Sequence, residues 1–458
     1  MIRFVDRQEE LALLDAAWRR PSAALVVLYG RRRVGKSRLI QEFLREKDGL
    51  YVIFEDTSRR LQLDDFRTRL ADHLSDEFLR RTSLDEWRDL FAYLAKTLPP
   101  RRRICIALDE FSFAVKNDRA LIPALQQFWD SFLSRTRVML ILSGSLLGLM
   151  TDEVLMSSSP LYGRRTRDIL LRPLRFADAG KFLRMPLTDR LRVYLTVGGV
   201  PEYLLRASDY RTADAFLQSE FFGQHGYFLR EPHFVLSQEF RDVKTYFAIV
   251  QAIAMGATHP AEIANAIGIK GREIYPYLES LIRLEIVTRE TPAWGGRKRG
   301  IYVLRDAVFD AWFNLVYPHR ERIESGGFLV PVDAVDRLLG KRFEMFVRTE
   351  GLRSILPQFD VVGPWWHAGE EIDFVAWNAK TQEVLLGECK WGERVDAEAI
   401  VRDLQRKAEG VNRPAGSRTR FAVVAGSFRR ETADALLIRR EEMLKASRQT
   451  QSEHARVF

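Results

Sequence analysis

A glycine-rich loop between an apolar strand and a helix is the feature that most constrains this sequence. Gly30, Gly35, Lys36 and Ser37 fit the pattern Gly-x4-Gly-Lys-Ser/Thr without a mismatch. An apolar run over residues 24–29 comes directly before the loop, and a helical pattern begins at Ser37. Such a segment places backbone N–H groups and a helix N-terminus around a phosphate. The sequence therefore predicts a phosphate-binding loop in a parallel α/β sheet, rather than a basic glycine turn that binds nothing.

The residues of the loop have distinct expected roles. We expect Lys36 to reach the β- and γ-phosphates of ATP and Ser37 to ligate Mg²⁺, so ATP and Mg²⁺ are the predicted cofactors. The candidate nucleotide-binding residues are Gly30, Arg31, Arg32, Arg33, Val34, Gly35, Lys36, Ser37 and Arg38.

A second apolar run ends in two carboxylates. Residues 104–108 are followed by Asp109 and Glu110, and ligands bind outside the carboxyl ends of such strands. We expect Asp109 to hold the Mg²⁺ shell and Glu110 to polarise the attacking water. Ser143 and Ser145 follow the next apolar run, either as hydrogen-bond donors in this site or as a plain turn.

Two neighbouring arginines are candidates for an arginine finger. Arg164 or Arg165 would stabilise the charge that develops on the transferred phosphoryl group, and ATP would drive self-association of the chain through one of them. The alternative is a solvated pair on the surface of an arginine-rich protein.

The chain of 458 residues is long enough for about three domains. Residues 1–235 alternate strand-like and helical runs, with expected strands at 23–29, 50–54, 104–108 and 138–142 and a helical extension after residue 171. The fold class is α/β multidomain, with a winged helix-turn-helix expected at 236–310 and a second α/β domain at 325–440.

These motifs carry a family resemblance in the first 235 residues. The chain resembles the archaeal-type ATPase family, which is related to AAA+ and STAND P-loop NTPases. The matching segments are 4–11, 28–37, 107–111, 160–165 and 198–203. The resemblance implies that Pro201, in a Gly-x-Pro motif, lies near the nucleotide base.

The middle segment has the element order of a winged helix. Expected helices at 246–254, 260–267 and 273–284 precede two strands, which flank a basic tip with Arg297, Lys298 and Arg299. The third helix would enter a DNA major groove and the tip would contact phosphates. The alternative is a module that contacts protein or covers the nucleotide domain.

A hairpin near the C-terminus brings carboxylates and a lysine together. If the turn is centred between residues 380 and 381, Asp373 lies opposite Glu388 on one face, and Lys390 points to that face too. Like charges held close need a counter-ion, which Mg²⁺ supplies, and Lys390 would orient or deprotonate a water. Glu344, on a preceding helix, is a further candidate ligand. The alternative is a hairpin with surface charges.

The Asp-x14-Glu-x-Lys spacing resembles the PD-(D/E)xK nuclease superfamily. Residues 325–435 resemble the restriction-endonuclease-like domain that often follows archaeal-type ATPases. The resemblance implies that Asp373, Glu388 and Lys390 are catalytic. The superfamily name implies a proline directly before the aspartate, but Pro364 lies further upstream and no Pro-Asp dipeptide occurs here. Trp365 and Trp366 would stack on nucleic acid or fill the core, and the core is the favoured interpretation.

Composition limits the partners. The net charge of +9 agrees with a nucleic-acid partner but also with a high arginine content. Cys105 and Cys389 lie far apart without metal-ligand spacing, which excludes a disulfide framework, and we expect a cytoplasmic protein that is not inserted in a membrane. The favoured function is an ATP-hydrolysing, DNA-binding protein with a Mg²⁺-dependent nuclease domain, and self-association on ATP binding is an added possibility. The alternative is a nucleotide-controlled switch that binds DNA or protein and cuts nothing.

Overall fold

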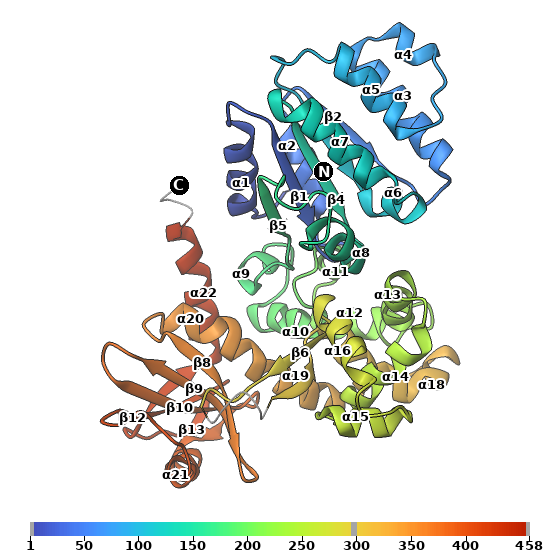
Figure 1. Ribbon diagram of the computed structural model, residues 1–458. Coiled ribbons are helices and arrows are strands. Elements are labelled where there is room, and N and C mark those ends of the chain that lie inside the picture. The colour runs from blue at the N-terminus through green and yellow to red at the C-terminus, as the bar shows by residue number, and fades with distance from the viewer. Residues whose placement is uncertain (1–3, 295–299, 455–458) are drawn as a thin grey trace. The chain divides into compact units, whose positions relative to one another are not determined.

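The computed structural model describes residues 4–294 and 300–454, drawn in colour in Figure 1. The chain divides into two compact units after Pro173. Among these described residues, no helix combines the length and apolar character needed to cross a membrane.

The division at Pro173 differs from the boundary expected at residue 235. Residues in the helical extension bond to much later segments. The indole N–H of Trp312 donates to Leu229 O at 2.9 Å, and the Tyr194 hydroxyl donates to Glu350 at 2.5 Å. Residues 174–235 therefore pack within the second unit, and the domain bounds expected from the sequence stay predictions.

The first unit is built around a parallel sheet of order β2-β3-β4-β1-β5. The four expected strands are confirmed as β1–β4 with small shifts at their ends, and β5 was not expected. The elements are α1 (Gln8–Trp18), β1 (Ala24–Tyr29), α2 (Lys36–Leu44), β2 (Gly49–Ile53), α3 (Arg59–Leu74), α4 (Glu77–Arg81), α5 (Trp87–Thr97), β3 (Cys105–Asp109), α6 (Phe111–Asn117), α7 (Leu121–Ser131), η1 (Leu133–Arg135), β4 (Met139–Gly144), α8 (Leu147–Leu149), η2 (Met150–Leu155) and β5 (Arg167–Leu170).

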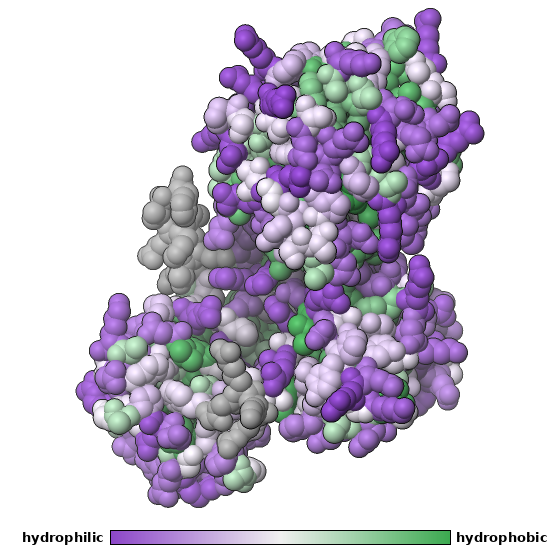
Figure 2. All heavy atoms as spheres, viewed as in Figure 1, coloured by the Kyte–Doolittle hydropathy of each residue, from purple (hydrophilic) through white to green (hydrophobic). Residues whose placement is uncertain are grey.

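Both faces of this sheet are buried, which explains why its strands are continuously apolar. In β1, Leu25 and Val27 pack into one hydrophobic cluster, whereas Val26 and Leu28 pack into the cluster on the other face. Helices cover the two faces (Figure 1). Hydrophilic residues dominate the face of the molecule shown in Figure 2, as expected when apolar side chains fill such cores.

The second unit begins with helices and continues into three helices and a hairpin. Its first elements are α9 (Phe176–Ala179), α10 (Leu187–Val197), α11 (Pro201–Ala207), α12 (Ala213–Glu220), η3 (Tyr227–Leu229) and α13 (Glu231–Glu239). The three helices and the antiparallel hairpin have the expected order, as α14 (Val243–Ala254), α15 (Pro260–Ile267), α16 (Ile274–Arg283), β6 (Val287–Glu290) and β7 (Ile301–Leu304). Short connecting helices follow, namely α17 (Ala307–Ala311), η5 (Trp312–Val316), η6 (Tyr317–His319) and α18 (Arg320–Glu324).

The last part of the second unit is a mixed sheet of order β14-β12-β10-β9-β8. Strands β8, β9 and β10 are antiparallel neighbours, and β10, β12 and β14 run parallel. The elements are α19 (Val332–Phe346), η7 (Val347–Gly351), α20 (Leu352–Ile355), β8 (Val361–His367), β9 (Glu370–Asn378), β10 (Glu383–Cys389), β11 (Val395–Asp396), α21 (Ala397–Ala408), β12 (Arg418–Ala425), β13 (Phe428–Arg430), β14 (Ala435–Arg439) and α22 (Arg440–His454).

Candidate functional site

The glycine-rich loop joins β1 to α2, as the sequence predicts. Gly35 has a φ of +96° at the N-cap of α2, a conformation that favours glycine. A Cβ on Gly30 would lie 2.3 Å from Leu171 O, so the close approach of these two backbones requires glycine. The two glycines therefore shape the backbone that faces the candidate phosphate position.

Lys36 folds back over the loop. Its ammonium donates to Gly30 O at 2.8 Å and to Arg31 O at 3.1 Å, and the side chain is only 5% exposed. A charged phosphate oxygen is a stronger hydrogen-bond acceptor for an ammonium than a carbonyl oxygen. A phosphate bound at the loop would therefore compete with these two carbonyls for Lys36.

The other loop side chains have varied surroundings. The Arg32 guanidinium lies over the Phe113 ring at 5.5 Å, and Arg38 pairs with Glu42 on α2. Arg33 has a φ of +68°, and Val34 is buried. Their contacts with a nucleotide stay predictions.

The acidic end of β3 is held by hydrogen bonds. Asp109 is fully buried, and its Oδ2 accepts from the Tyr51 hydroxyl at 2.6 Å. Glu110 begins α6 with a φ of +51° and accepts from Ser145 Oγ at 2.6 Å. Sequence reasoning missed Tyr51, because only the pairing of β2 with β3 brings it to Asp109. A serine donor beside Glu110 favours the interpretation of Ser145 as part of this site.

Neither finger candidate has a free guanidinium. Arg164 makes two contacts of 2.7 Å with the Asp130 carboxylate. Arg165 pairs with Asp168 and donates to Leu155 O. A finger role would require either arginine to leave these partners. Pro201 is the first residue of α11 in the second unit, and its expected place near the base stays a prediction.

In the second unit, the hairpin of β9 and β10 has the expected register. The paired residues run from Glu383 and Asn378 to Gly387 and Phe374, and Glu388 and Asp373 directly follow this last pair. A Cβ on Gly387 would lie 2.0 Å from the Phe374 ring, so glycine is required where this ring crosses the strand. Asp373 Oδ2 accepts from Cys389 N at 2.7 Å. The two carboxylates therefore share one end of the hairpin.

Lys390 joins these carboxylates. Its ammonium lies 2.9 Å from Glu388 Oε2 and 3.8 Å from Asp373 Oδ2. Glu344, on α19, is close enough for its charge to act on Asp373. We refer to Glu344, Asp373, Glu388 and Lys390 as the carboxylate cluster.

Burial and mutual repulsion disturb the cluster's ionisation. Burial, with the charges of Glu344 and Glu388, raises the pKa of Asp373 to about 8. Burial also raises the pKa of Glu344 to about 7. Burial acts on Glu388 in the same sense, but hydrogen bonds and charge from Lys390 and a bond from Lys407 outweigh it and lower its pKa. Glu388 is thus the ionised member, and Asp373 and Glu344 retain protons near neutrality.

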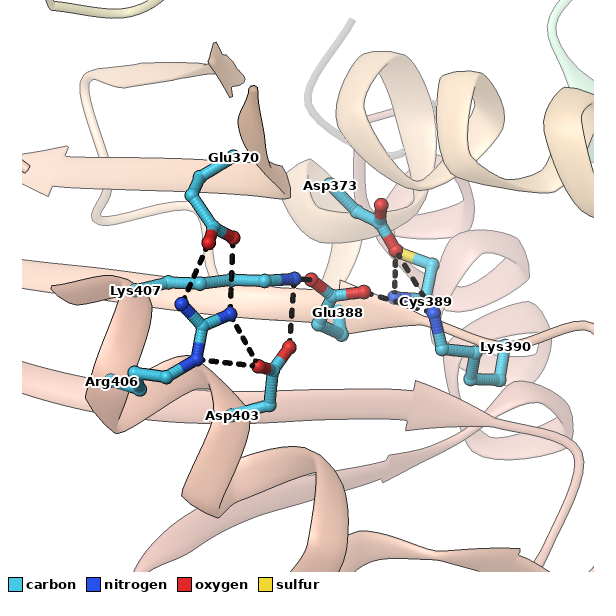
Figure 3. A network of polar contacts seen from close by, with 8 residues as sticks. All are labelled: Glu370, Asp373, Glu388, Cys389, Lys390, Asp403, Arg406 and Lys407. Carbon is cyan, nitrogen blue, oxygen red and sulfur yellow. Dashed lines mark hydrogen bonds and ion pairs between the residues drawn. The ribbon is translucent and has the colours of Figure 1, made fainter. Parts of the chain in front are cut away.

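A second lysine reaches the cluster from α21 (Figure 3). Lys407 donates to Glu388 Oε1 at 3.0 Å and lies 2.9 Å from Asp403. The next residue back, Arg406, pairs with Glu370 and Asp403. No motif or spacing in the sequence predicts that Lys407 contacts Glu388.

The donor set of the cluster suits a divalent cation in part. Its carboxylate oxygens are the ligands that Mg²⁺ prefers. Among residues 4–294 and 300–454, however, no three His, Cys, Asp or Glu side chains are arranged to hold an ion by themselves. A cation bound at Asp373 and Glu388 would therefore need water or phosphate oxygens to complete its shell.

The segment that follows β6 packs against the second sheet. Ala293 N donates to Pro364 O of edge strand β8 at 2.8 Å, and the Trp294 ring contacts Trp377 with centroids 6.4 Å apart. Trp365 is 4% exposed, as the core interpretation predicts. The basic tip at residues 297–299 lies outside the described residues.

Arg348 links the hairpin of β6 and β7 to the strand that carries Asp373. It donates to Asp373 O at 3.0 Å and to Glu290 of β6 at 3.2 Å. A displacement of β6 would therefore act on the strand that carries Asp373.

Comparisons with known proteins identify two parts of the chain. Residues 4–207 match the family described as an ATPase domain predominantly from Archaea. Residues 312–400 match a family described as archaeal and bacterial proteins of unknown function.

Individual proteins match over longer and shorter stretches. An uncharacterised protein of Methanocaldococcus jannaschii is 29% identical over 427 residues, 89% of this chain and 92% of that protein. An uncharacterised ATP-binding protein of the same organism is 51% identical over 47 residues, 10% of this chain and 80% of that protein. The solved Walker-type ATPase of Pyrococcus abyssi is 21% identical, with a TM-score of 0.49, over 68% of this chain and 96% of that one. Residues 4–207 are therefore similar to an ATPase domain that occurs predominantly in Archaea, and residues 312–400 are similar to a family whose function is unknown.

Proposed function

We propose that this protein binds and hydrolyses ATP at the glycine-rich loop and that its C-terminal part binds DNA and cleaves it at the carboxylate cluster. The observation that carries the second half is the convergence of Asp373 from β9, Glu388 from β10, Lys390 directly after β10 and Glu344 from α19. Buried like charges at this spacing are costly unless a cation or protons offset them.

At the loop, each residue has one task. Lys36 exchanges its carbonyl partners for the β- and γ-phosphates, and the loop N–H groups surround them. Ser37 and Asp109 would hold Mg²⁺, which would offset the phosphate charge. Glu110 orients the attacking water, with Ser145 fixing its carboxylate.

At the cluster, Asp373 and Glu388 would hold Mg²⁺, and Glu344 would have to move to become a further ligand. The cation would lower the pKa of a water and offset charge on the scissile phosphate. Lys390 is an ammonium between the two carboxylates and would orient the water rather than take its proton. Asp373 and Glu344 must first lose the protons that burial favours.

The segment from α14 to β7 serves as a winged helix-turn-helix that contacts DNA. Its support is the element order together with Lys270 and Arg272 in the turn before α16. ATP would change how this segment packs or promote self-association through Arg164 or Arg165, and Arg348 would pass a movement of β6 to Asp373.

The decisive experiment is a cleavage assay with Mg²⁺ and linear, supercoiled and branched DNA, with and without ATP. We expect the native protein to cut at least one substrate and Asp373→Ala to bind DNA without cutting, because the variant lacks a cation ligand. Glu398→Ala removes an exposed carboxylate of α21 outside the cluster and should cut normally. Normal cleavage by Asp373→Ala would refute the assignment.

A second candidate is a nucleotide-controlled switch that binds DNA or protein without cleavage. The ammonium groups of Lys390 and Lys407 both contact Glu388 and neutralise the carboxylate that a cation would use, which favours this alternative. ATP hydrolysis without cleavage of any substrate would support it.

A further inference from the structure

We infer that Tyr51 is a positioning residue of the nucleotide site, whose hydroxyl orients Asp109 and Ser37 for a magnesium–nucleotide complex. Tyr51 lies on β2, the edge strand beside β3. The inference rests on the proposed ATP site and adds a residue to which the motifs assign no role.

The contact between Tyr51 and Asp109 is short and protected. The hydroxyl donates to Oδ2 of Asp109 at 2.6 Å, while Oδ1 accepts from Glu110 N at 3.0 Å. Both oxygens of a fully buried carboxylate are thus fixed by donors. The tyrosine ring packs against the cluster that contains Leu39 and Phe43 of α2, which fixes the position of the hydroxyl.

Ser37 lies beside the same hydroxyl. A side-chain hydrogen bond joins Ser37 to the Tyr51 hydroxyl. A phenol is protonated at neutral pH, and this one donates its proton to Asp109, which leaves its oxygen as an acceptor for the Ser37 hydroxyl. A serine that ligates a cation must point its proton away from the cation, and the Tyr51 oxygen accepts that proton.

The geometry separates two effects of losing the hydroxyl. Without it, Ser37 loses its acceptor and Asp109 loses one donor, so both are free to take orientations that do not suit the cation. The loop backbone and Lys36 bind phosphate without using Tyr51. Removal of the hydroxyl should therefore weaken the effect of Mg²⁺ on nucleotide binding and spare binding without Mg²⁺.

The test is a titration of the full chain with a fluorescent ATP analogue, in Mg²⁺ and in EDTA. We expect Tyr51→Phe to bind within twofold of the native protein in EDTA and about fivefold more weakly in Mg²⁺. Tyr93→Phe is the matched control, since the Tyr93 hydroxyl donates to the Asp76 carboxylate at 2.7 Å elsewhere in the same unit. The control should bind like the native protein in both buffers.

The outcomes are distinguishable. An equal gain from Mg²⁺ in Tyr51→Phe and the native protein would overturn the inference. Equal weakening of Tyr51→Phe in both buffers would also overturn it, because the hydroxyl would then support the fold and not the cation. Failure of the native protein to bind the analogue in either buffer would instead refute the proposed ATP site. A raised Mg²⁺ requirement for hydrolysis, with an unchanged rate at saturation, would add support.

Discussion

The glycine-rich loop and the carboxylate cluster are polar sites built in opposite ways. The loop is one contiguous segment, residues 30–37, and its shape depends on backbone conformation at Gly30 and Gly35. The cluster takes side chains from α19, β9 and β10 and is tied to α21 by Lys407. A contiguous backbone site depends on few residues, whereas a side-chain site depends on the register and packing of the whole unit.

The charges of the two sites are also opposite. Lys36 donates to the neutral carbonyl oxygens of Gly30 and Arg31, and the charged oxygens of a phosphate would compete with them for its ammonium. The cluster holds three carboxyl groups, and the pKa values of two of them are raised. The charge of the loop therefore favours binding of phosphate, and the carboxyl groups of the cluster favour binding of protons or a cation.

The largest expected effect is on the loop. Lys36→Ala should weaken ATP binding at least about 100-fold, because the ammonium provides a charge-assisted contact to the phosphates. The melting temperature should change little, since the glycines and backbone maintain the loop. Fluorescent-nucleotide titration and thermal unfolding measure the two quantities.

Lys96→Ala, which removes an exposed lysine of α5, is the control and should bind ATP normally. If Lys36→Ala bound ATP with the native affinity, the assignment of the loop to the nucleotide site would be wrong.

The next effect is the pH dependence of cation binding at the cluster. A cation binds ionised carboxylates. Because the pKa values of Asp373 (about 8) and Glu344 (about 7) are raised, these two groups must lose their protons when the cation binds. Mn²⁺ affinity should therefore rise about tenfold or more per pH unit between pH 5.5 and 7. Calorimetry in buffers of different ionisation heat would also detect the released protons.

In Asp373→Asn, the rise with pH should be smaller and the affinity lower. A Mn²⁺ affinity that is flat over this range would contradict the raised pKa values.

The smallest effect concerns how the cluster is held together. Lys407→Ala should lower the free energy of unfolding by about 1–3 kcal/mol, because it leaves Oε1 of the buried Glu388 without its lysine donor. Chemical denaturation measures the change. Arg402→Ala breaks an exposed pair with Glu398 and should cost less than about 1 kcal/mol. If both variants lowered the free energy of unfolding by the same amount, Lys407 would contribute no more to stability than a residue of an exposed ion pair.

Part of the cluster was predictable because a hairpin is a local structure. Its turn centre, read from the sequence, predicts Asp373 opposite Glu388, and the observed pairs up to Gly387 and Phe374 have the register that this turn centre requires. The role of Lys407 was not predictable, because α21 reaches Glu388 only through packing of Leu404 and Ala408 on the sheet. The same limit applies to Tyr51, whose partner Asp109 lies 58 residues away.

The domain boundary shows a similar limit. The helical pattern after residue 171 is visible in the sequence, but a helix pattern does not specify which partner buries its apolar face. Contacts such as Trp312 with Leu229 decide that these helices pack in the second unit.

The sequence by itself determined the parallel sheet, the glycine-rich loop and the paired carboxylates of the hairpin. The loop and the hairpin depend on interactions between residues close in the chain, and the strands of the parallel sheet are visible as continuous apolar runs. Only the tertiary structure decided that Tyr51 meets Asp109, that Lys407 meets Glu388 and that Arg164 meets Asp130. These contacts join distant segments, and their energies depend on burial, which no spacing in the sequence specifies.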